Sequence, residues 1–533
     1  MEERGKRHQI FRKIGKRPGV HGKEFLLCAF AALCVLLLFS KSSWLYPFND
    51  WPDVNMFFTM GKGMLHGKVP YVDLAEQKGP YVFLAGAVGY LLSNTGFYGY
   101  FLLELLSFSF FLFYAARIIA LYTDFPSIWI LPLLGAGIGC AKSFVHGGSL
   151  EELCLGFFAY GIYSLLRFLR SPDGSMPKGT LLANGVIAGI LLWSKFTLLG
   201  LHIVWAVAVG IVFLRRKKYR RLLEGTGLFL GGMAAATIPW LIYFGWHHAI
   251  GDWFQAYLWD NIFGYTQKGH ASLSQRLAAA VGNALDSLKD RDNRTYSLWV
   301  IAGGILFILL PGKKASWREK ISVAFMGFGM SLGIFIGGTK HDYYGLPLSS
   351  FGIFGILCAV LFAGELAGKL PAKLIYRLSQ KKRLLAAGCF LLFLGAGCWL
   401  GFLNSPNTYL LRIEREEMPQ YRFAGIMQES GDTSMLNYGF LDGGFYTVLG
   451  EVPDTKYYCT LNVNPSLSLA SQNTVLERGG VEWVVTWKAY MAEEEELRRL
   501  PVVSESYTLT DYQYFYFEGD MRTYALYRYS GTE

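Results

Sequence analysis

Long apolar blocks separated by short polar stretches dominate the first three quarters of the chain. A helix that crosses the hydrocarbon core of a bilayer needs about 20 consecutive, mostly apolar residues. Blocks of this kind predict full membrane-spanning helices at residues 24–40, 98–120, 125–145, 152–169, 180–196, 198–214, 222–245, 296–311, 320–337, 344–364 and 385–403. Residues 79–92 are also apolar, but a run this short often lies at the interface or re-enters the membrane. The pattern predicts a polytopic α-helical membrane protein with about eleven full spans and one partial or interfacial helix.

The pattern changes after residue 404, where polar turns separate shorter elements. Two helical stretches and two strand-like runs are expected there, at Glu414–Gln428, Leu467–Arg478, Val481–Trp487 and Tyr512–Phe517. Helical and β-rich runs that alternate in this way are typical of a small α/β domain. The chain therefore ends in a predicted soluble α/β domain at residues 404–533.

Basic residues predict the orientation of the chain in the membrane. They cluster beside the apolar blocks, at Lys6–Arg17, 167–178, Arg215–Arg221, Lys313–Lys320 and Lys373–Arg383. Loops rich in Lys and Arg stay on the cytoplasmic side. All of these clusters fall inside if the N-terminus is inside and residues 79–92 do not fully cross. We therefore expect a cytoplasmic basic segment (1–23), a transmembrane domain (24–403) with a first external loop (41–78), and an extracytoplasmic C-terminal domain. The protein is expected to reside in the cytoplasmic (plasma) membrane.

Charge and composition exclude a nucleic-acid partner and indicate the bilayer instead. Only 17% of the 533 residues are charged and 52% are hydrophobic. The net charge is +10, but the basic residues lie in short clusters beside the apolar blocks and do not form a separate basic domain. A nucleic-acid-binding surface would combine a basic patch with interleaved aromatic residues on one domain. The basic clusters beside the spans are better explained as membrane anchors.

The first external loop carries the most informative polar residues. Its carboxylates include Asp50, Asp53 and Asp73, and it ends near Lys78. A partly desolvated carboxylate can act as a general base on a hydroxyl, and a lysine can hold a phosphate as a point charge. Two simpler interpretations remain: the charges are solvated and inactive, or Asp53 caps a short helix that begins near Val54.

Two later external turns also carry charge. Glu151 and Glu152 open a span, where they could favour the helix dipole, bind a divalent cation such as Mg²⁺ or Mn²⁺, or orient an acceptor. Lys340 and His341 occupy a turn at 337–344, where an anionic headgroup would lie or where they could simply anchor the interface. Lys195, near the end of its helix, is a further candidate for contact with a phosphate.

The order of these motifs resembles the GT-C class of membrane glycosyltransferases, which includes protein O-mannosyltransferases and the aminoarabinose transferases that modify lipid A. The resemblance rests on the Asp-bearing first loop, Tyr71-Val72-Asp73 with Gln77-Lys78-Gly79-Pro80, the turn at 147–152, Ser194-Lys195-Phe196 and His341-Asp342-Tyr343-Tyr344. It covers most of residues 24–365. Many relatives have Asp-Glu and Lys-Pro-Pro where this chain has Asp53-Val54 and Lys78-Gly79-Pro80.

The resemblance implies transfer of a hexosyl or pentosyl group from a polyprenyl-phosphate donor to an extracytoplasmic acceptor, which would be a cell-envelope glycan, glycolipid or glycoprotein. Asp53 best matches the catalytic carboxylate of that class, with Asp50 as its rival. Lys78, Lys340, His341 and Lys195 are then expected to bind the donor phosphate. Asp50, Asp73, Glu151 and Glu152 are candidates for the acceptor or a metal.

The alternative is a transporter or flippase of a lipid-linked saccharide. Such a protein is expected to show inverted repeats and broken helices near the bilayer midplane. The sequence has no such repeat, and its polar candidates gather on one membrane face, which favours the transferase.

Overall fold

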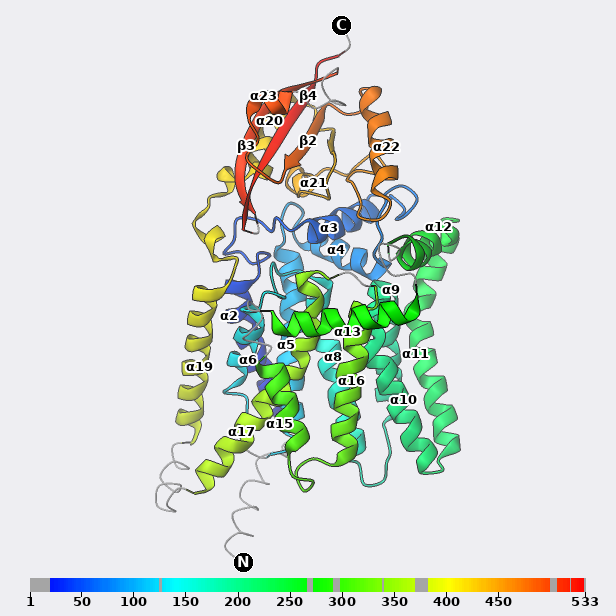
Figure 1. The fold of residues 1–533 in the computed structure, drawn as a ribbon, viewed down its shortest axis with the longest axis vertical. Coiled ribbons are helices and arrows are strands. Elements are labelled where there is room, and N and C mark those ends of the chain that lie inside the picture. The colour runs from blue at the N-terminus through cyan, green and yellow to red at the C-terminus, as the bar shows by residue number, and fades with distance from the viewer. Residues whose placement is uncertain are drawn as a thin grey trace, which may run out of the picture. The chain divides into compact units, whose positions relative to one another are not determined.

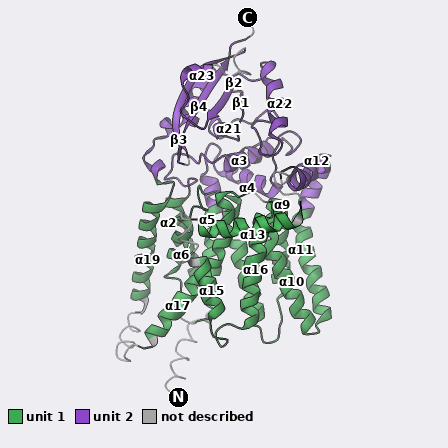
Figure 2. Ribbon diagram, in the orientation of Figure 1, with its two compact units in different colours: residues 1–40, 104–237, 272–408 green, residues 41–103, 238–271, 409–533 purple. Residues whose placement is uncertain are grey.

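The computed structural model describes residues 20–123, 127–265, 272–290, 298–337, 340–369, 382–498, 506–517 and 519–531. Contacts within the chain define two compact units (Figure 2). Unit 1 comprises residues 1–40, 104–237 and 272–408, and unit 2 comprises residues 41–103, 238–271 and 409–533. The first external loop and the polar tail predicted from the sequence thus fall in one unit. Most of the predicted basic segment 1–23 and of the cluster 373–383 lies outside the described residues.

Unit 1 is helical throughout its described residues (Figure 1). Its helices, some of which extend past its bounds, are α2 (Val20–Phe39), α5 (Tyr98–Ile119), α6 (Leu131–Gly139), α7 (Leu150–Leu153), α8 (Leu155–Leu169), α9 (Lys178–Lys195), η1 (Phe196–Leu199), α10 (Gly200–Arg215), α11 (Tyr219–Trp246), α13 (Leu273–Lys289), η4 (Leu298–Ala302), α15 (Gly303–Leu309), α16 (Trp317–Phe335), η5 (Asp342–Phe351), α17 (Gly352–Gly368), α19 (Lys382–Asn404) and η6 (Thr408–Arg412). The local sequence determines where several of these helices begin. Capping boxes open α13 at Ser272 and Gln275 and α16 at Ser316 and Glu319, where side chains satisfy the orphan amides of the first turn.

Seven helical segments are long and apolar enough to cross a membrane, as far as the described residues go. They are Gly22–Phe39, Tyr98–Ile119, Leu150–Leu169, Lys178–Arg215, Tyr219–Trp246, Asp342–Ala367 and Leu384–Asn404. Large apolar side chains such as Leu223, Ile242 and Leu392 are exposed on these helices. Apolar surface on this scale is unusual on a soluble monomer and is expected where a helix faces lipid. The polytopic helical fold is therefore confirmed, whereas the count of about eleven spans remains a prediction.

Unit 2 combines short helices with one β-sheet (Figure 1). Its helices are α3 (Pro52–Leu65), α4 (Pro80–Leu92), α12 (Ile250–Phe254), η2 (Gln255–Tyr265), η7 (Arg415–Glu417), α20 (Pro419–Ser430), α21 (Phe445–Leu449), α22 (Pro465–Glu477) and α23 (Glu494–Arg498). Its strands are β1 (Met435–Asn437), β2 (Trp483–Lys488), β3 (Tyr507–Phe517) and β4 (Asp520–Tyr529). The small α/β domain expected at the C-terminus is thus present. The predicted run Tyr512–Phe517 lies within β3, and Val481–Trp487 overlaps β2 from Trp483 onward.

The sheet has the strand order β1-β2-β4-β3. β1 and β2 are parallel, with Leu436 opposite Val484, whereas β4 runs antiparallel to both β2 and β3. Leu436, Leu476, Val484 and Tyr527 belong to its buried apolar core. The burial of these side chains supplies the main favourable term for folding of this part of the chain.

Two glycines bring the backbones of α3 and α4 into direct contact. A Cβ added to Gly61 would lie 2.1 Å from the Ala87 nitrogen, and one added to Gly86 would lie 2.0 Å from the Phe57 oxygen. Only glycine fits where backbones approach this closely. Residues 79–92, the short apolar run of the sequence, form the 13-residue helix α4 of this pair; whether this helix crosses the membrane remains a prediction.

Candidate active site

Asp53 lies in the first turn of α3. The helix begins at Pro52, which suits the first helical position because its missing amide would have no partner there. The cap residue is Trp51, so the alternative in which Asp53 caps a helix beginning near Val54 is wrong in position. A carboxylate in a first turn is favoured by the helix dipole. Asp53 is half-buried, which leaves part of its side chain accessible.

The segment from Val69 to Lys78 is held by hydrogen bonds of its own backbone and of distant parts of unit 2. Tyr71 adopts a φ of 71°, a conformation rare outside glycine, and its hydroxyl donates to the Lys78 carbonyl at 2.7 Å. The Lys456 carbonyl accepts from the Ala75 amide at 2.9 Å. Asn261 donates to the Gln77 carbonyl at 2.7 Å. Backbone strain of this kind persists only where the surroundings hold it, often at functional sites.

Glu76 is a buried carboxylate of the first external loop, which also contains Asp53 and Lys78. Its Oε1 accepts a hydrogen bond from the Lys78 amide at 3.2 Å, and its Oε2 has no partner among the described residues. Burial raises the pKa of Glu76, the charge of Lys78 opposes that shift, and the charge of Asp53 adds to it. Asp53 and Lys78 are therefore each within electrostatic reach of Glu76.

The remaining carboxylates of the first loop have other partners. Asp50 forms a fully buried ion pair with Lys41, with 2.7 Å between Oδ1 and Nζ. Asp73 is exposed and accepts the Val69 amide at 2.6 Å, which stabilises the turn. Asp50 and Asp73 therefore have structural roles in addition to those expected from the sequence. Of the two candidates for the base, Asp53 is more accessible than Asp50.

In unit 1, Lys195 and Glu151 form an ion pair that the sequence pattern does not reveal. The Lys195 Nζ lies 2.6 Å from Glu151 Oε1 and 3.7 Å from the ring centre of Tyr344. Tyr343 lies on the same cation at 5.4 Å. An ammonium between a carboxylate and aromatic faces is stabilised by both. Lys195 and Glu151, predicted as a phosphate ligand and an acceptor or metal ligand, thus bind each other.

Glu152 and the turn before it form a compact backbone structure. Its amide donates to Ser149 Oγ at 3.1 Å, and its Oε2 accepts from the Gly148 amide at 2.9 Å. Gly147 and Gly148 have φ values of 79° and 82°. Glu152 is fully buried, and its Oε1 has no hydrogen-bond partner in the described part of the chain.

Lys340 and His341 precede η5 and are both exposed. The His341 ring stacks on Tyr343, with 5.8 Å between ring centres, and meets Tyr344 edge-on at 5.1 Å. The same two tyrosines thus contact both Lys195 and His341. Residues 338 and 339 of this predicted turn lie outside the described residues.

No group of three or more His, Cys, Asp or Glu side chains that could hold a metal ion occurs among the described residues. Glu152 and the carboxylates of the first loop therefore do not form such a cluster. The Mg²⁺ or Mn²⁺ expected from the sequence stays a prediction.

Unit 2 also contains a cavity of about 260 Å³ beside the first loop. Lys41, Asn49, Tyr98, Arg415 and Gln428 contribute polar groups to its lining. Arg415 also donates a hydrogen bond to the Tyr98 hydroxyl. A polar cavity of this kind suits a hydroxyl-rich group better than an apolar one.

No protein family model and no curated protein sequence matches the chain. Solved structures do match. ArnT from Cupriavidus metallidurans bound to undecaprenyl phosphate aligns with a TM-score of 0.55 and 14% identity, over 95% of this chain and 98% of that one. The chain has the ArnT fold. ArnT from the same organism in the apo state gives a TM-score of 0.54 and 15% identity, over 96% and 98%.

The ArnT fold agrees with the resemblance found in the sequence, because ArnT is an aminoarabinose transferase of the GT-C class. The agreement concerns the fold of nearly the whole chain, whereas the resemblance in the sequence covers most of residues 24–365. The roles of Asp53, Lys78, Lys340, His341 and Lys195 remain predictions. Glu76 is the residue that sequence reasoning missed, although the Glu76-Gln77-Lys78 spacing already places a carboxylate beside the candidate phosphate ligand.

Proposed function

We propose that the protein is a glycosyltransferase that moves a sugar from a polyprenyl-phosphate donor to a hydroxyl acceptor on the outer face of the cytoplasmic membrane. The observation that carries this proposal is that Asp53, the candidate base, and Lys78, the candidate phosphate ligand, each interact electrostatically with the buried Glu76. The ArnT fold supports it, since one ArnT structure contains undecaprenyl phosphate.

Asp53 acts as the general base. It takes the proton of the acceptor hydroxyl while the acceptor oxygen forms a bond to the anomeric carbon of the sugar. The bond between that carbon and the phosphate oxygen breaks, and polyprenyl phosphate leaves with the bonding electrons. The half-buried side chain of Asp53 in the first turn of α3 leaves its carboxylate accessible, and a base must come within hydrogen-bond distance of the acceptor.

Lys78 stabilises the negative charge that grows on the leaving phosphate. A cation fixed beside a departing oxyanion lowers the barrier most when it is already oriented. The hydrogen bonds of the Lys78 backbone to Tyr71 and Glu76 provide this orientation. Glu76 is a positioning residue, whose buried carboxyl accepts the Lys78 amide.

Lys340, His341 and Lys195 are proposed as further phosphate contacts. His341 and Lys340 are exposed, so an anion can reach both side chains. Lys195 already binds Glu151, so its positive charge is largely compensated and its contribution should be smaller.

The decisive experiment uses the purified full-length protein in proteoliposomes. It measures transfer from radiolabelled polyprenyl-phosphate hexoses and pentoses to extracted envelope lipids, glycans and glycoproteins. Asp53→Asn keeps the size of the side chain and removes the base, so transfer should fall by at least about 10²-fold. Asp454→Asn is the matched control, because Asp454 is exposed and pairs only with Lys68 among the described contacts.

Three other results would change the proposal. An active Asp53→Asn beside an inactive Asp50→Asn or Glu152→Gln would move the base to that other carboxylate. Full activity of all three variants would exclude general-base catalysis by these residues. Movement of labelled donor between leaflets without any transfer would favour the transporter.

A further inference from the structure

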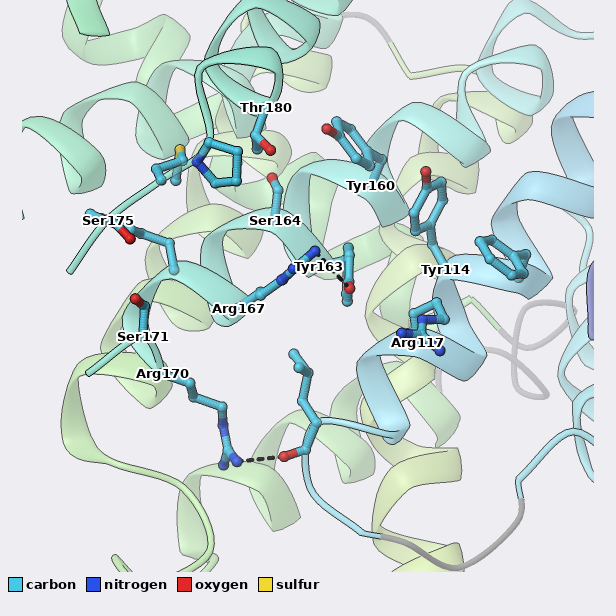
Figure 3. Close-up of a pocket in the computed structure, with 15 residues that line it drawn as sticks. Tyr114, Arg117, Tyr160, Tyr163, Ser164, Arg167, Arg170, Ser171, Ser175 and Thr180 are labelled. Carbon is cyan, nitrogen blue, oxygen red and sulfur yellow. Dashed lines mark hydrogen bonds between the residues drawn. The ribbon is translucent and has the colours of Figure 1, made fainter. Parts of the chain in front are cut away.

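A second cavity lies in unit 1 and takes no part in the proposed reaction. Its volume is about 650 Å³, and its lining includes Arg117, Arg167 and Arg170 together with Tyr114, Tyr160 and Tyr163 (Figure 3). These residues come from the C-terminal part of α5, from α8 between its middle and its end, and from the residue that follows α8. The beginning of α9 supplies Thr180 on another wall.

This cavity and the Glu151–Lys195 pair lie at opposite ends of one membrane span. Glu151 lies at the start of the segment Leu150–Leu169 and Arg167 near its end, and that segment is 20 residues long. At 1.5 Å per residue, such a helix extends about 30 Å, the thickness of the hydrocarbon core. The cavity is therefore at the membrane face opposite Glu151, which is the cytoplasmic face in the predicted topology.

Two of the three arginines already have carboxylate partners. Arg117 lies 3.6 Å from Glu24, and Arg170 lies 2.6 Å from Glu319. Arg170 also donates to the Leu121 carbonyl, as Figure 3 shows. These pairs neutralise two positive charges and hold the walls of the cavity in place.

Arg167 is different, because it has no ion-pair partner among the described residues. It is exposed, and its guanidinium donates only a long 3.5 Å bond to the Tyr163 hydroxyl. Asp173 is exposed and accepts hydrogen bonds from Ser171 and Ser175, two residues that line the cavity. Arg167 thus leaves donors available to an anion inside the cavity.

Aromatic rings form the remaining wall. The Tyr114 ring lies 5.0 Å from Tyr160 and 5.6 Å from Tyr163, measured between ring centres. Tyrosine is enriched at the headgroup level of membranes, where its ring meets apolar chains and its hydroxyl meets water. The cavity therefore offers cationic donors for a phosphate and an aromatic face for the glycerol and upper acyl groups of the same lipid.

We propose that this cavity binds the phosphate headgroup of an anionic glycerophospholipid, with Arg167 as the principal donor. Basic pockets between transmembrane helices on the cytoplasmic side commonly hold such headgroups. This site is distinct from the proposed donor site and does not depend on the transferase activity.

Native mass spectrometry of the full-length protein in detergent tests this site. The lipids are phosphatidylglycerol, phosphatidylcholine with the same acyl chains, and undecaprenyl phosphate. The variants are Arg167→Gln, Arg167→Lys and, as a matched control, Arg221→Gln. Arg221 is an exposed arginine of α11 that does not line the cavity. The native protein should bind phosphatidylglycerol at least about fivefold more tightly than phosphatidylcholine, the effect of one basic residue near a headgroup.

Arg167→Gln should remove this preference, Arg167→Lys should keep part of it, and Arg221→Gln should keep all of it. The proposal fails if the native protein shows no preference for phosphatidylglycerol. It also fails if Arg167→Gln and Arg167→Lys both retain that preference. Equal losses in Arg167→Gln and Arg221→Gln would indicate general surface charge instead of a site. Binding of undecaprenyl phosphate alone, lost in Arg167→Gln, would assign the cavity to a polyprenyl lipid and overturn the glycerophospholipid.

Discussion

The hydroxyl of Thr59 in α3 donates a 2.6 Å hydrogen bond to the Asp442 carboxylate, 383 residues later in the chain. Asp442 also accepts the Gly444 amide at 2.9 Å and the Asn437 amide group at 3.3 Å. Lys62, one turn after Thr59, donates to the Tyr446 carbonyl at 2.7 Å. Within unit 2, a buried polar network thus links the helix that starts with Asp53 to the C-terminal residues.

Thr59→Val should lower the free energy of unfolding by about 1–3 kcal/mol, because it removes a donor from a buried carboxylate. Thr59→Ser keeps the hydroxyl and serves as the control, with a smaller loss. Both are measured by thermal unfolding of the purified protein in detergent. Equal melting temperatures for Thr59→Val and the native protein would mean that this bond contributes nothing net.

Lys62 should make stability depend on pH in the alkaline range. Burial lowers the pKa of Lys62 to about 8, while Asp442 and Glu451 oppose that shift. The ordinary value in the unfolded chain is 10.5, so the unfolded state holds more protons between these pH values. Stability should therefore rise as pH increases from about 8 to about 10.5.

Lys62→Met should flatten that rise in an apparent melting temperature measured at successive pH values. Lys68→Met is the matched control, because Lys68 is partly exposed and pairs with Asp454 at 3.0 Å. The native slope should persist in the control. An identical slope in both variants would exclude Lys62 as its source.

The Lys195–Glu151 pair can be tested for a structural role. Lys195→Met leaves the buried Glu151 carboxylate without its cation, which should cost about 3–5 kcal/mol. The double variant Lys195→Met/Glu151→Gln should recover most of that loss in thermal unfolding. If Lys195→Met instead lowers transfer without lowering stability, Lys195 acts on the donor and the pair matters little for folding.

Two candidate phosphate ligands, the half-buried Lys78 and the exposed Lys340, can be compared directly. Lys78→Ala and Lys340→Ala should each lower turnover by about 10²–10³-fold, the typical cost of one lost contact to a developing oxyanion. Steady-state transfer is measured with both variants at matched expression and membrane insertion. Unchanged turnover in both would remove the phosphate role from these lysines.

Orientation follows from impermeant thiol labelling of intact cells, in a background without the eight native cysteines. A cysteine at Glu429 should be labelled, and one at Arg221 should react only after the cells are opened. Both residues are exposed on helices. Glu429 is preferable to the neighbouring Gly431, whose φ of 83° would strain a side chain. The reverse pattern would place the C-terminal domain inside the cell.

Long apolar helices were the most predictable part of this fold. The span expected at 98–120 is α5, which runs from Tyr98 to Ile119. The span expected at 152–169 corresponds to the end of α7 and the whole of α8, which ends at Leu169. Lipid-facing helices need a continuous apolar run, so their sequence alone marks them. The amphipathic helix α13 lies between the spans predicted at 222–245 and 296–311, where no helix was expected, although Ser272 and Gln275 form its capping box.

The candidate site was predictable only where its residues lie close together in sequence. Asp53 and Lys78 belong to one loop, and their proximity was expected. Glu151 and Lys195 lie 44 residues apart, and their pairing depends on how α7 and α9 pack. The same is true of Thr59 and Asp442. Sequence order carries no distance information at such separations. Residue types alone therefore led to ligand roles for Lys195 and Glu151, and their pairing with each other was missed.

The close backbone contact at Gly61 and Gly86 fixes the spacing of α3 and α4, which matters for the proposed catalysis. Main-chain atoms do not rotate out of the way as side chains do, so the spacing of α3 and α4 is nearly fixed before any donor arrives. Groups that are already in place need no reorganisation when charge develops, and reorganisation is a large part of an uncatalysed barrier. In the proposed reaction, a methyl group added at either glycine should therefore slow transfer by displacing these helices, without removing any charged group.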